Sequence, residues 1–231
     1  MSHLSIVVPV LDEASGIGAT LESLRELRAR GCEVVVVDGG SRDATREIAA
    51  PLADRVVEAP RGRAAQMNAG ARAASGDILI FLHADTRLPP GADQSLRLGM
   101  RRTGARWGRF DVTIAGSSPM LRVVARLMNA RSRVSGIATG DQAIFVRRDA
   151  FEAVGGFPEI PLMEDIALSK RLKRLSPPLC LRDRVVTSGR RWERHGTLRT
   201  IFLMWRLRSA YALGADPRRL ARDYDVERTS G

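Results

Sequence analysis

Short apolar runs and amphipathic segments alternate along the first third of the chain. Runs of consecutive apolar residues indicate strands that are buried on both faces. They lie at residues 4–10, 33–38 and 77–83, and a further short strand is predicted at 55–58. Between them, apolar residues recur at helical spacing or follow helix-capping residues, which predicts helices. These predicted helices cover residues 16–30, 41–50 and 64–75.

The rest of the chain is less regular. Apolar residues at helical spacing predict further helices at 91–102, 119–131, 148–154, 163–175 and 198–213. Two more strands are predicted at 106–114 and 142–146. The chain is polar after Asp216, and we expect a mobile tail there.

Strands that alternate with helices predict an α/β fold with a mostly parallel, twisted sheet and helices on both faces. A length of 231 residues suits a single domain. A change in composition near residue 100 divides it into a Rossmann-like half, 1–100, and a second half, 101–215, followed by the tail 216–231. Ligands of such sheets bind beyond the carboxyl ends of the strands.

Arginine dominates the charge of the chain. The formal net charge is +11, and of the 37 basic residues only Lys170 and Lys173 are lysines. Guanidinium groups suit phosphate oxygens, so a nucleotide, a nucleic acid or an anionic membrane is a plausible partner, although a solvated basic surface explains the charge equally well. Cys32 and Cys180 stand apart without a CxxC pattern and are expected to be core thiols. Without a signal-peptide pattern or a long apolar run, we expect a cytoplasmic location.

Acidic side chains gather where the predicted strands end. Asp12 and Glu13 follow the first strand, Asp38 ends the second, and Asp85 follows the fourth. Crowded carboxylates repel one another, and hard oxygen ligands favour Mg²⁺ or Mn²⁺. Each residue could instead cap a helix or turn, but three together point to a ligand. The phosphate-binding loops GxGxxG and GxxxxGK[ST] are absent from the sequence, which disfavours the usual dinucleotide fold and P-loop enzymes.

Four motifs in order resemble glycosyltransferase family 2, whose fold is called GT-A. They are VVPVLDE (7–13), VVDGGSRDAT (36–45), GRAAQMNAGA (62–71) and FLHADT (81–86). The resemblance implies an enzyme that uses a nucleotide-sugar, with a UDP-sugar favoured, and a divalent metal, Mn²⁺ or Mg²⁺. It also implies a nucleotide-binding set of residues: Pro9, Leu11, Glu13, Asp38, Arg63, His83, Ala84 and Asp85.

Within that set the resemblance gives particular roles. Glu13 would contact the ribose, Asp38 the base, and Asp85 the metal as the last acid of the family's DxD motif. His83 stands where that motif begins with Asp. A neutral imidazole can ligate a metal but brings no negative charge, so His83 either binds the metal weakly or contacts only the nucleotide, and we prefer the second interpretation.

Later motifs resemble the family's acceptor side. Gly140, Asp141 and Gln142 match its glycine-rich segment, and Glu164–Asp165 matches its ED motif. The resemblance implies that Asp165, in preference to Glu164, is the general base that takes the proton of an acceptor hydroxyl, in a single displacement that inverts the anomeric centre. Acidic residues in the first turn of a helix are also common for structural reasons.

Arg191 and Trp192 resemble part of the QxxRW motif of processive members, but the glutamine is missing, which argues against polymer synthesis. Arg191 could bind the diphosphate, Trp192 could stack on the acceptor, and His195 could be a late metal ligand; a basic surface turn with a core tryptophan is the alternative. The basic, apolar helix at 198–213 could lie on the inner face of a membrane, which would suit a lipid acceptor, or pack on the domain or on a second copy in a homodimer.

Three other functions compete with sugar transfer. A sugar nucleotidyltransferase would need an early glycine-rich phosphate loop, which VPVLDE is not. A nucleic-acid-binding protein would need stacking aromatics, yet aromatics are 5% of the chain, so we expect no nucleic-acid partner. An inactive sugar-nucleotide binder stays open because of His83. The acceptor, a small molecule or a lipid, is not specified.

Overall fold

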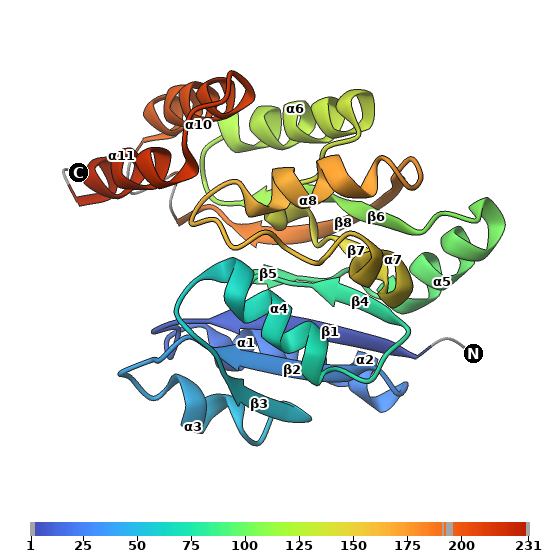
Figure 1. Ribbon diagram of the computed structural model, residues 1–231. Coiled ribbons are helices and arrows are strands. Elements are labelled where there is room, and N and C mark those ends of the chain that lie inside the picture. Colours follow the sequence, from blue (N-terminus) through green and yellow to red (C-terminus); the bar gives the residue numbers. More distant parts are fainter. Residues whose placement is uncertain (1–2, 191, 193–195, 230–231) are drawn as a thin grey trace.

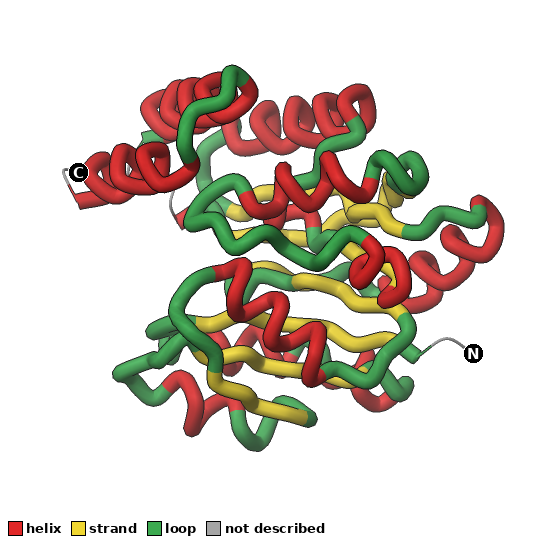
Figure 2. Tube along the Cα trace, in the orientation of Figure 1, coloured by secondary structure: helices red, strands yellow, loops and turns green. Residues whose placement is uncertain are grey.

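A computed structural model describes the backbone of residues 3–190, 192 and 196–229, and the side chains as far as Tyr224 (Figures 1 and 2). The strands are β1 (Leu4–Val10), β2 (Glu33–Asp38), β3 (Arg55–Glu58), β4 (Ile78–Phe81), β5 (Thr86–Arg87), β6 (Trp107–Ala115), β7 (Phe145–Arg147) and β8 (Leu179–Ser188). The helices of the first half are α1 (Ile17–Glu22), α2 (Arg25–Ala29), α3 (Thr45–Ala49), α4 (Arg63–Ala73) and α5 (Ala92–Thr103). The later ones are α6 (Met120–Ser135), η1 (Gly140–Gln142), α7 (Arg148–Ala153), α8 (Glu164–Leu172), α10 (Thr197–Ala212) and α11 (Pro217–Thr229).

The described strands form one eight-stranded sheet in the order β3-β2-β1-β4-β7-β6-β8-β5. β1 pairs in parallel with β2 and β4, and β2 with β3. β7 runs antiparallel to both of its neighbours, β6 and β8 are parallel, and β5 is an antiparallel edge. Only β7 and β5 therefore run against the common direction, and the expected α/β fold with a mostly parallel sheet is confirmed.

Alternate residues of the central strands sort into two cores, as the period of a strand requires. Ile6, Val8 and Val36 pack with α1, α2, α3, α5 and α6 on one face. Val7 and Val35 pack with α4, α7 and α8 on the other. The strand sequences are apolar at almost every position because both faces are covered.

Helix α4 lies very close to the sheet. A Cβ on Gly70 would overlap the Val7 side chain and come 2.8 Å from Cγ2 of Val37. The glycine therefore allows the approach of helix and strands, and it explains one of the small residues in the motif of residues 62–71.

Several element boundaries differ from the predictions. The helix expected at 16–30 is two short helices, because the chain turns at Ser23–Leu24 between α1 and α2. The helix expected at 41–50 begins only at Thr45, since Ser41 is bound to the carboxylate of Asp38 and cannot cap it. The strand expected at 142–146 is shifted, because residues 140–142 form the turn η1.

Two predictions need larger corrections. The ten-residue strand β8 was not expected. Charged residues interrupt the apolar residues in its sequence, and the strand lies between β6 and β5, near the edge of the sheet. The tail after Asp216, expected to be mobile, contains helix α11. Leu220 and Tyr224 of α11 pack with Leu207 of α10 and Ile166 of α8, so tertiary contacts order a segment whose composition is polar.

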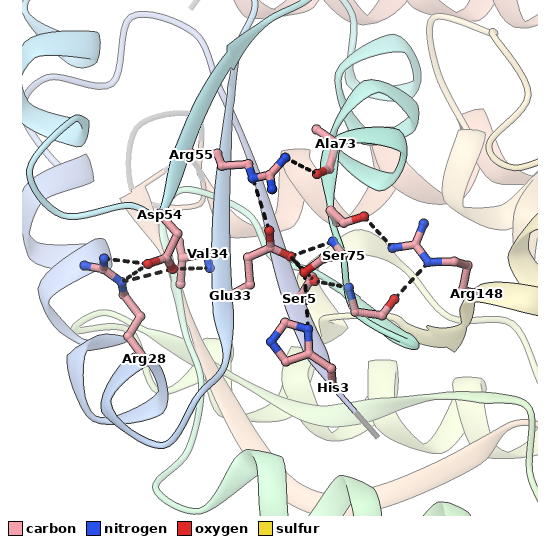
Figure 3. Close-up of polar contacts among 12 residues, drawn as sticks. His3, Ser5, Arg28, Glu33, Val34, Asp54, Arg55, Ala73, Ser75 and Arg148 are labelled. Atoms are coloured by element: carbon pink, nitrogen blue, oxygen red, sulfur yellow. Dashed lines mark hydrogen bonds and ion pairs between the residues drawn. The ribbon is translucent and has the colours of Figure 1, made fainter. Parts of the chain in front are cut away.

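A polar network joins the amino ends of β1, β2 and the chain entering β4 (Figure 3). The buried carboxylate of Glu33 accepts hydrogen bonds from Ser5 Oγ at 2.5 Å and from the backbone N–H of Ser75 at 2.7 Å. Arg148 donates to the carbonyls of Ala71, Ala74 and Gly76 at 2.8–2.9 Å. Interactions within the protein therefore close the sheet at the amino ends of its strands. A ligand can enter at the carboxyl ends.

Candidate active site

A cleft of about 1020 Å³ opens at the carboxyl ends of β1, β4, β6 and β8. Residues from both halves of the chain line it. The predicted site residues among them are Pro9, Leu11, Glu13, Arg63, His83, Ala84, Asp85, Gly140, Asp141, Glu164, Asp165 and Trp192. The tertiary structure therefore brings the early motifs and the later acidic motif to one place.

The loop after β1 is held by the loop after β2. The backbone N–H groups of Asp12 and Glu13 donate to Ser41 Oγ at 2.9 Å and to Thr45 Oγ1 at 2.8 Å. That of Ala14 donates to Asp43 Oδ2 at 3.1 Å. The polar residues of the second motif thus act as supports that present Glu13 to the cleft.

Two residues of α4 were not singled out from the sequence, although both lie within the quoted motif. Nε2 of Gln66 donates to the carbonyls of Val10 at 2.7 Å and Val37 at 2.9 Å, which ties the ends of β1 and β2 together. Asn68 pairs with both backbone groups of Phe157, on the segment that leads to α8. An amide side chain that must pair with two backbone groups explains why Gln and Asn stand there.

Glu13 and Asp85 face the cleft as a pair of interacting carboxylates. Burial raises the pKa of Glu13, the charge of Asp85 raises it further, and Arg190 and Arg63 oppose the shift. No group of three or more His, Cys, Asp or Glu side chains in the described part of the chain is placed to hold a metal ion by itself. Mg²⁺ and similar ions are often held by one or two carboxylates together with substrate phosphates. Asp85, with Glu13 beside it, fits that kind of shared site.

His83 lies against the glycine of the later motif. Its Nδ1 is 3.4 Å from Oδ1 of Asp141. A Cβ on Gly140 would overlap the imidazole ring. The imidazole therefore occupies the space that the missing side chain of Gly140 leaves, and it links the motif of residues 81–86 to the segment of residues 140–142.

Asp165 is held at the start of α8 with its carboxylate towards the cleft. Oδ2 accepts the backbone N–H of Gly140 at 2.9 Å, and Oδ1 accepts that of Ile166 at 2.7 Å. The side chain is half-buried and lines the cleft. Each carboxylate oxygen has a further lone pair, so the group can still accept a proton from a ligand.

Glu164, its neighbour, is buried, at 5% exposure. Burial and the charge of Asp165 raise its pKa to about 7, while Arg63 and His83 oppose the shift. The guanidinium of Arg63 lies 4.0 Å from its carboxylate. A carboxyl group that changes charge near neutral pH at the cleft is a common feature of active sites.

Three residues other than glycine have positive φ among those described, and all lie in the loops around the cleft. They are Asp12 (51°) after β1, Ala143 (46°) after η1 and Met163 (70°) before α8. Such backbone is costly, and strain of this kind often accumulates at functional sites. It leaves no signal in the sequence.

Some predicted site residues lie elsewhere. Asp38 is fully buried, does not line the cleft, and accepts the backbone N–H groups of Gly40 and Ser41 at 3.0 Å. Gln142 is fully buried, with its Oε1 accepting the N–H of Thr139 at 3.2 Å. Arg191 and His195 lie outside the described residues. The base-binding role of Asp38 stays a prediction, as does the acceptor role of Gln142.

The basic helix predicted at 198–213 is α10, and its apolar residues differ in how far they are buried. Leu207 is buried against α8 and α11, whereas Leu198, Phe202 and Trp205 are 61%, 68% and 64% exposed. Part of the stripe therefore packs on the domain. Contact of the exposed part with a membrane or a second copy stays a prediction. No helix in the described part of the chain has the length and apolarity needed to span a bilayer.

Comparison with known proteins gives a match to the model of glycosyl transferase family 2 over residues 5–154. The succinoglycan biosynthesis protein ExoA of Rhizobium meliloti is 33% identical over 199 residues, which cover 78% of this chain and 60% of that protein. The chain spans about 60% of the length of the curated relatives it matches first.

Solved structures show the same architecture. S. aureus TarS 1–349 in complex with UDP has a TM-score of 0.66 at 18% identity, over 80% of this chain and 60% of that one. The mannosyltransferase PcManGT of Pyrobaculum calidifontis, in complex with GDP-Man and Mn²⁺, has a TM-score of 0.64 at 23% identity, over 90% of this chain and 61% of that one. These likenesses confirm the GT-A type of fold.

Proposed function

Because the chain belongs to glycosyl transferase family 2, we propose that it transfers a sugar from a nucleotide-sugar to an acceptor hydroxyl, with inversion at the anomeric carbon. One observation carries the proposal. A single cleft is lined both by Glu13 and Asp85, at the ends of β1 and β4, and by Asp165, at the start of α8. Donor and acceptor can therefore meet between these groups.

Asp165 acts as the general base in this proposal. It takes the proton from the acceptor hydroxyl while the oxygen bonds to the anomeric carbon and the bond from that carbon to the diphosphate oxygen breaks. The nucleoside diphosphate leaves with the electron pair. The hydrogen bonds from Gly140 and Ile166 fix the carboxylate, which keeps it in position for the proton.

Asp85, with Glu13 nearby, would hold a divalent cation together with the diphosphate. When bound, Mn²⁺ or Mg²⁺ supplies positive charge to the leaving group. Arg190 and Arg63, the first residue of α4, bring fixed positive charge that acts on Glu13. A UDP-sugar is the favoured donor, as the resemblance of the early motifs implies.

Substitution of the base tests the proposal. Asp165→Asn should bind UDP with Mn²⁺ as the parent does, by calorimetry, and lose about 10²- to 10⁴-fold in the rate of transfer, measured with a panel of nucleotide-sugars. Asp85→Ala is the complementary variant and should lose metal-dependent UDP binding. Glu164→Gln is the control for the base, because it alters the neighbouring carboxyl.

Two outcomes would contradict the assignment. Transfer that survives in Asp165→Asn but disappears in Glu164→Gln would move the base to Glu164. UDP binding that is the same with and without Mn²⁺, and unchanged in Asp85→Ala, would remove the metal from the mechanism.

A further inference from the structure

The proposed mechanism gives no role to Arg131, a charged residue that lines the cleft. Arg131, on α6, has its Nε and Nη2 atoms buried without a hydrogen-bond partner among the described residues. Burial lowers its pKa to about 10, and the charge of Arg208 adds to the effect, while Asp165 and Asp141 oppose it. Buried charged donors without partners are rare and costly in folded proteins.

Arg208, on α10, shares this environment. Burial lowers its pKa, and Asp165 and Asp141 oppose the shift. Both arginines line the cleft. The fold thus places two guanidinium groups close enough to repel each other, beside the proposed base.

The backbone that carries Arg131 is anchored on both sides. Asn129 pairs with both backbone groups of Val112 on β6, at 2.9 and 3.0 Å. Ser132 Oγ accepts Nε of the fully buried Arg109 at 3.1 Å. The direction of the Arg131 side chain into the cleft is therefore set by the fold.

The arginines belong to the acceptor side of the cleft. The charges that act on Glu13 are those of Asp85, Arg190, Asp43 and Arg63. Neither Arg131 nor Arg208 is among them. The charges that act on Arg131 are instead Arg208, Asp165, Asp141 and Arg109. The unpaired donors therefore lie near the charges of Asp165 and Asp141, while Arg63 interacts both with Glu13 and with Glu164.

We propose that Arg131 and Arg208 form a subsite for a phosphate group carried by the acceptor, next to the hydroxyl that receives the sugar. The inference rests on the proposed function, because it assigns the acceptor of that reaction. Both arginines line the cleft, and a phosphate there would bring negative charge and acceptor oxygens to two guanidinium groups whose fork geometry suits it.

The wall beside the arginines is apolar. Leu127 and Val134 of α6 and Trp205 of α10 line the cleft and are 59%, 91% and 64% exposed. A hydrocarbon chain attached to the phosphate would cover these side chains, whereas a water-soluble phosphorylated acceptor would leave them in water. Both sources share the phosphate, and the experiment distinguishes them.

Binding of two probes to the full chain tests the subsite. Glycerol 3-phosphate and dihexanoyl phosphatidylglycerol both carry a hydroxyl near a phosphate, and only the second carries acyl chains. Each is titrated by calorimetry in saturating UDP and Mn²⁺, so that the donor diphosphate site is already filled. We expect binding that is about 10- to 100-fold weaker in Arg131→Met and in Arg208→Met.

Arg126→Met is the matched control, because Arg126 is exposed on the same helix and does not line the cleft. It should bind the probes as the parent does. Arg131→Lys keeps the positive charge but lacks the forked guanidinium group, and it should give an intermediate loss of affinity for the probes. The probe that binds more tightly to the parent identifies a lipid or a water-soluble acceptor.

Three results would overturn the subsite: no binding of either probe to the parent, an equal loss in Arg126→Met, or a loss of UDP affinity in Arg131→Met as large as the loss of probe affinity. The last result would show that the arginines bind the diphosphate of the donor. If the parent binds no UDP but binds a probe through Arg131, the proposed function fails and the phosphate subsite stands.

Discussion

Glu33 and Glu164 are the same buried side chain in opposite surroundings. Glu33 lies at the amino ends of the strands, where burial alone would raise its pKa but hydrogen bonds from Ser5 and Ser75, with Arg55 nearby, outweigh burial and lower it. Glu164 lies at the cleft beyond the carboxyl ends, where burial and Asp165 raise its pKa to about 7. The hydrogen bonds to Glu33 outweigh its burial, whereas Arg63, 4.0 Å from Glu164, does not outweigh the burial of that carboxyl group.

Arg148 and Arg131 differ in the same way as the two glutamates. Arg148, at the amino ends of the strands, donates to three backbone carbonyls between the end of α4 and the start of β4. Arg131, in the cleft, has buried nitrogen atoms without a partner in the described part of the chain. The cost of burying a charge is offset by hydrogen bonds within the protein at the amino ends of the strands, whereas in our proposal a ligand offsets part of it at the carboxyl ends. Polar groups that fold the protein and polar groups that serve a ligand can be separated in this way.

The largest expected effect is a difference in the free energy of unfolding between variants of Arg148 and of Arg131. Arg148→Met should lower the free energy of unfolding by about 2–4 kcal/mol, because three carbonyls lose a charged donor. Arg131→Met should change it by less than about 1 kcal/mol, because the substitution removes a buried charge that has no partner. Urea unfolding at pH 7, followed by circular dichroism, gives both values. Equal losses in the two variants would break the comparison.

The two glutamates should differ in the sign of their pH dependence. The pKa of Glu164 is raised in the folded state, so its contribution to stability is present below pH 4.5 and is lost as the pH rises through about 7. The difference in unfolding free energy between the parent and Glu164→Gln should therefore fall by about 2–3 kcal/mol from pH 5 to pH 8.

Glu33→Gln is the matched variant. The pKa of Glu33 is lowered by folding, so its contribution is present above the unfolded value and is lost only as the pH falls towards the folded one. From pH 5 to pH 8 the parent should therefore keep or gain stability relative to Glu33→Gln. Unfolding curves at both pH values test this, and parallel pH profiles for the two glutamine variants would contradict it.

A smaller effect is expected from the contact between the two halves of the cleft. Gly140→Ala would push His83 out of its place, and we expect about a tenfold lower kcat/KM for transfer, since misplaced groups lose rate steeply. In Gly16→Ala the added methyl group would meet only Arg190, at 3.9 Å, so this control should keep its activity. Equal activity of the two variants would show that the position of His83 does not matter.

Much of the architecture could be predicted from local patterns. Each early strand, at 4–10, 33–38, 55–58 and 77–83, is found within two residues of its prediction at either end. Three of these strands are buried on both faces, so each appears in the sequence as an apolar run, whereas the edge strand at 55–58 has only two apolar residues. Strand β8 was missed because it lies towards the sheet edge and mixes charged and apolar residues.

The candidate site was predicted unevenly. Asp85, Glu13 and Asp165 line the cleft as the motifs indicated. Asp38 looks the same in the sequence, but its carboxylate is bound by its own loop. The supports at Gln66 and Asn68 were missed because an amide that pairs with backbone looks like any polar residue on a helix surface.

The α/β fold, the positions of the early strands and the carboxylates that follow them could be read from the sequence alone, because strand burial and motif spacing are local properties of the chain. Which polar groups are left without partners became visible only in the folded protein. Arg131 and Arg148 are indistinguishable by residue type, and Glu33 and Glu164 likewise. Whether a buried charge is satisfied depends on groups from distant segments, and these meet only when the sheet and its helices have assembled.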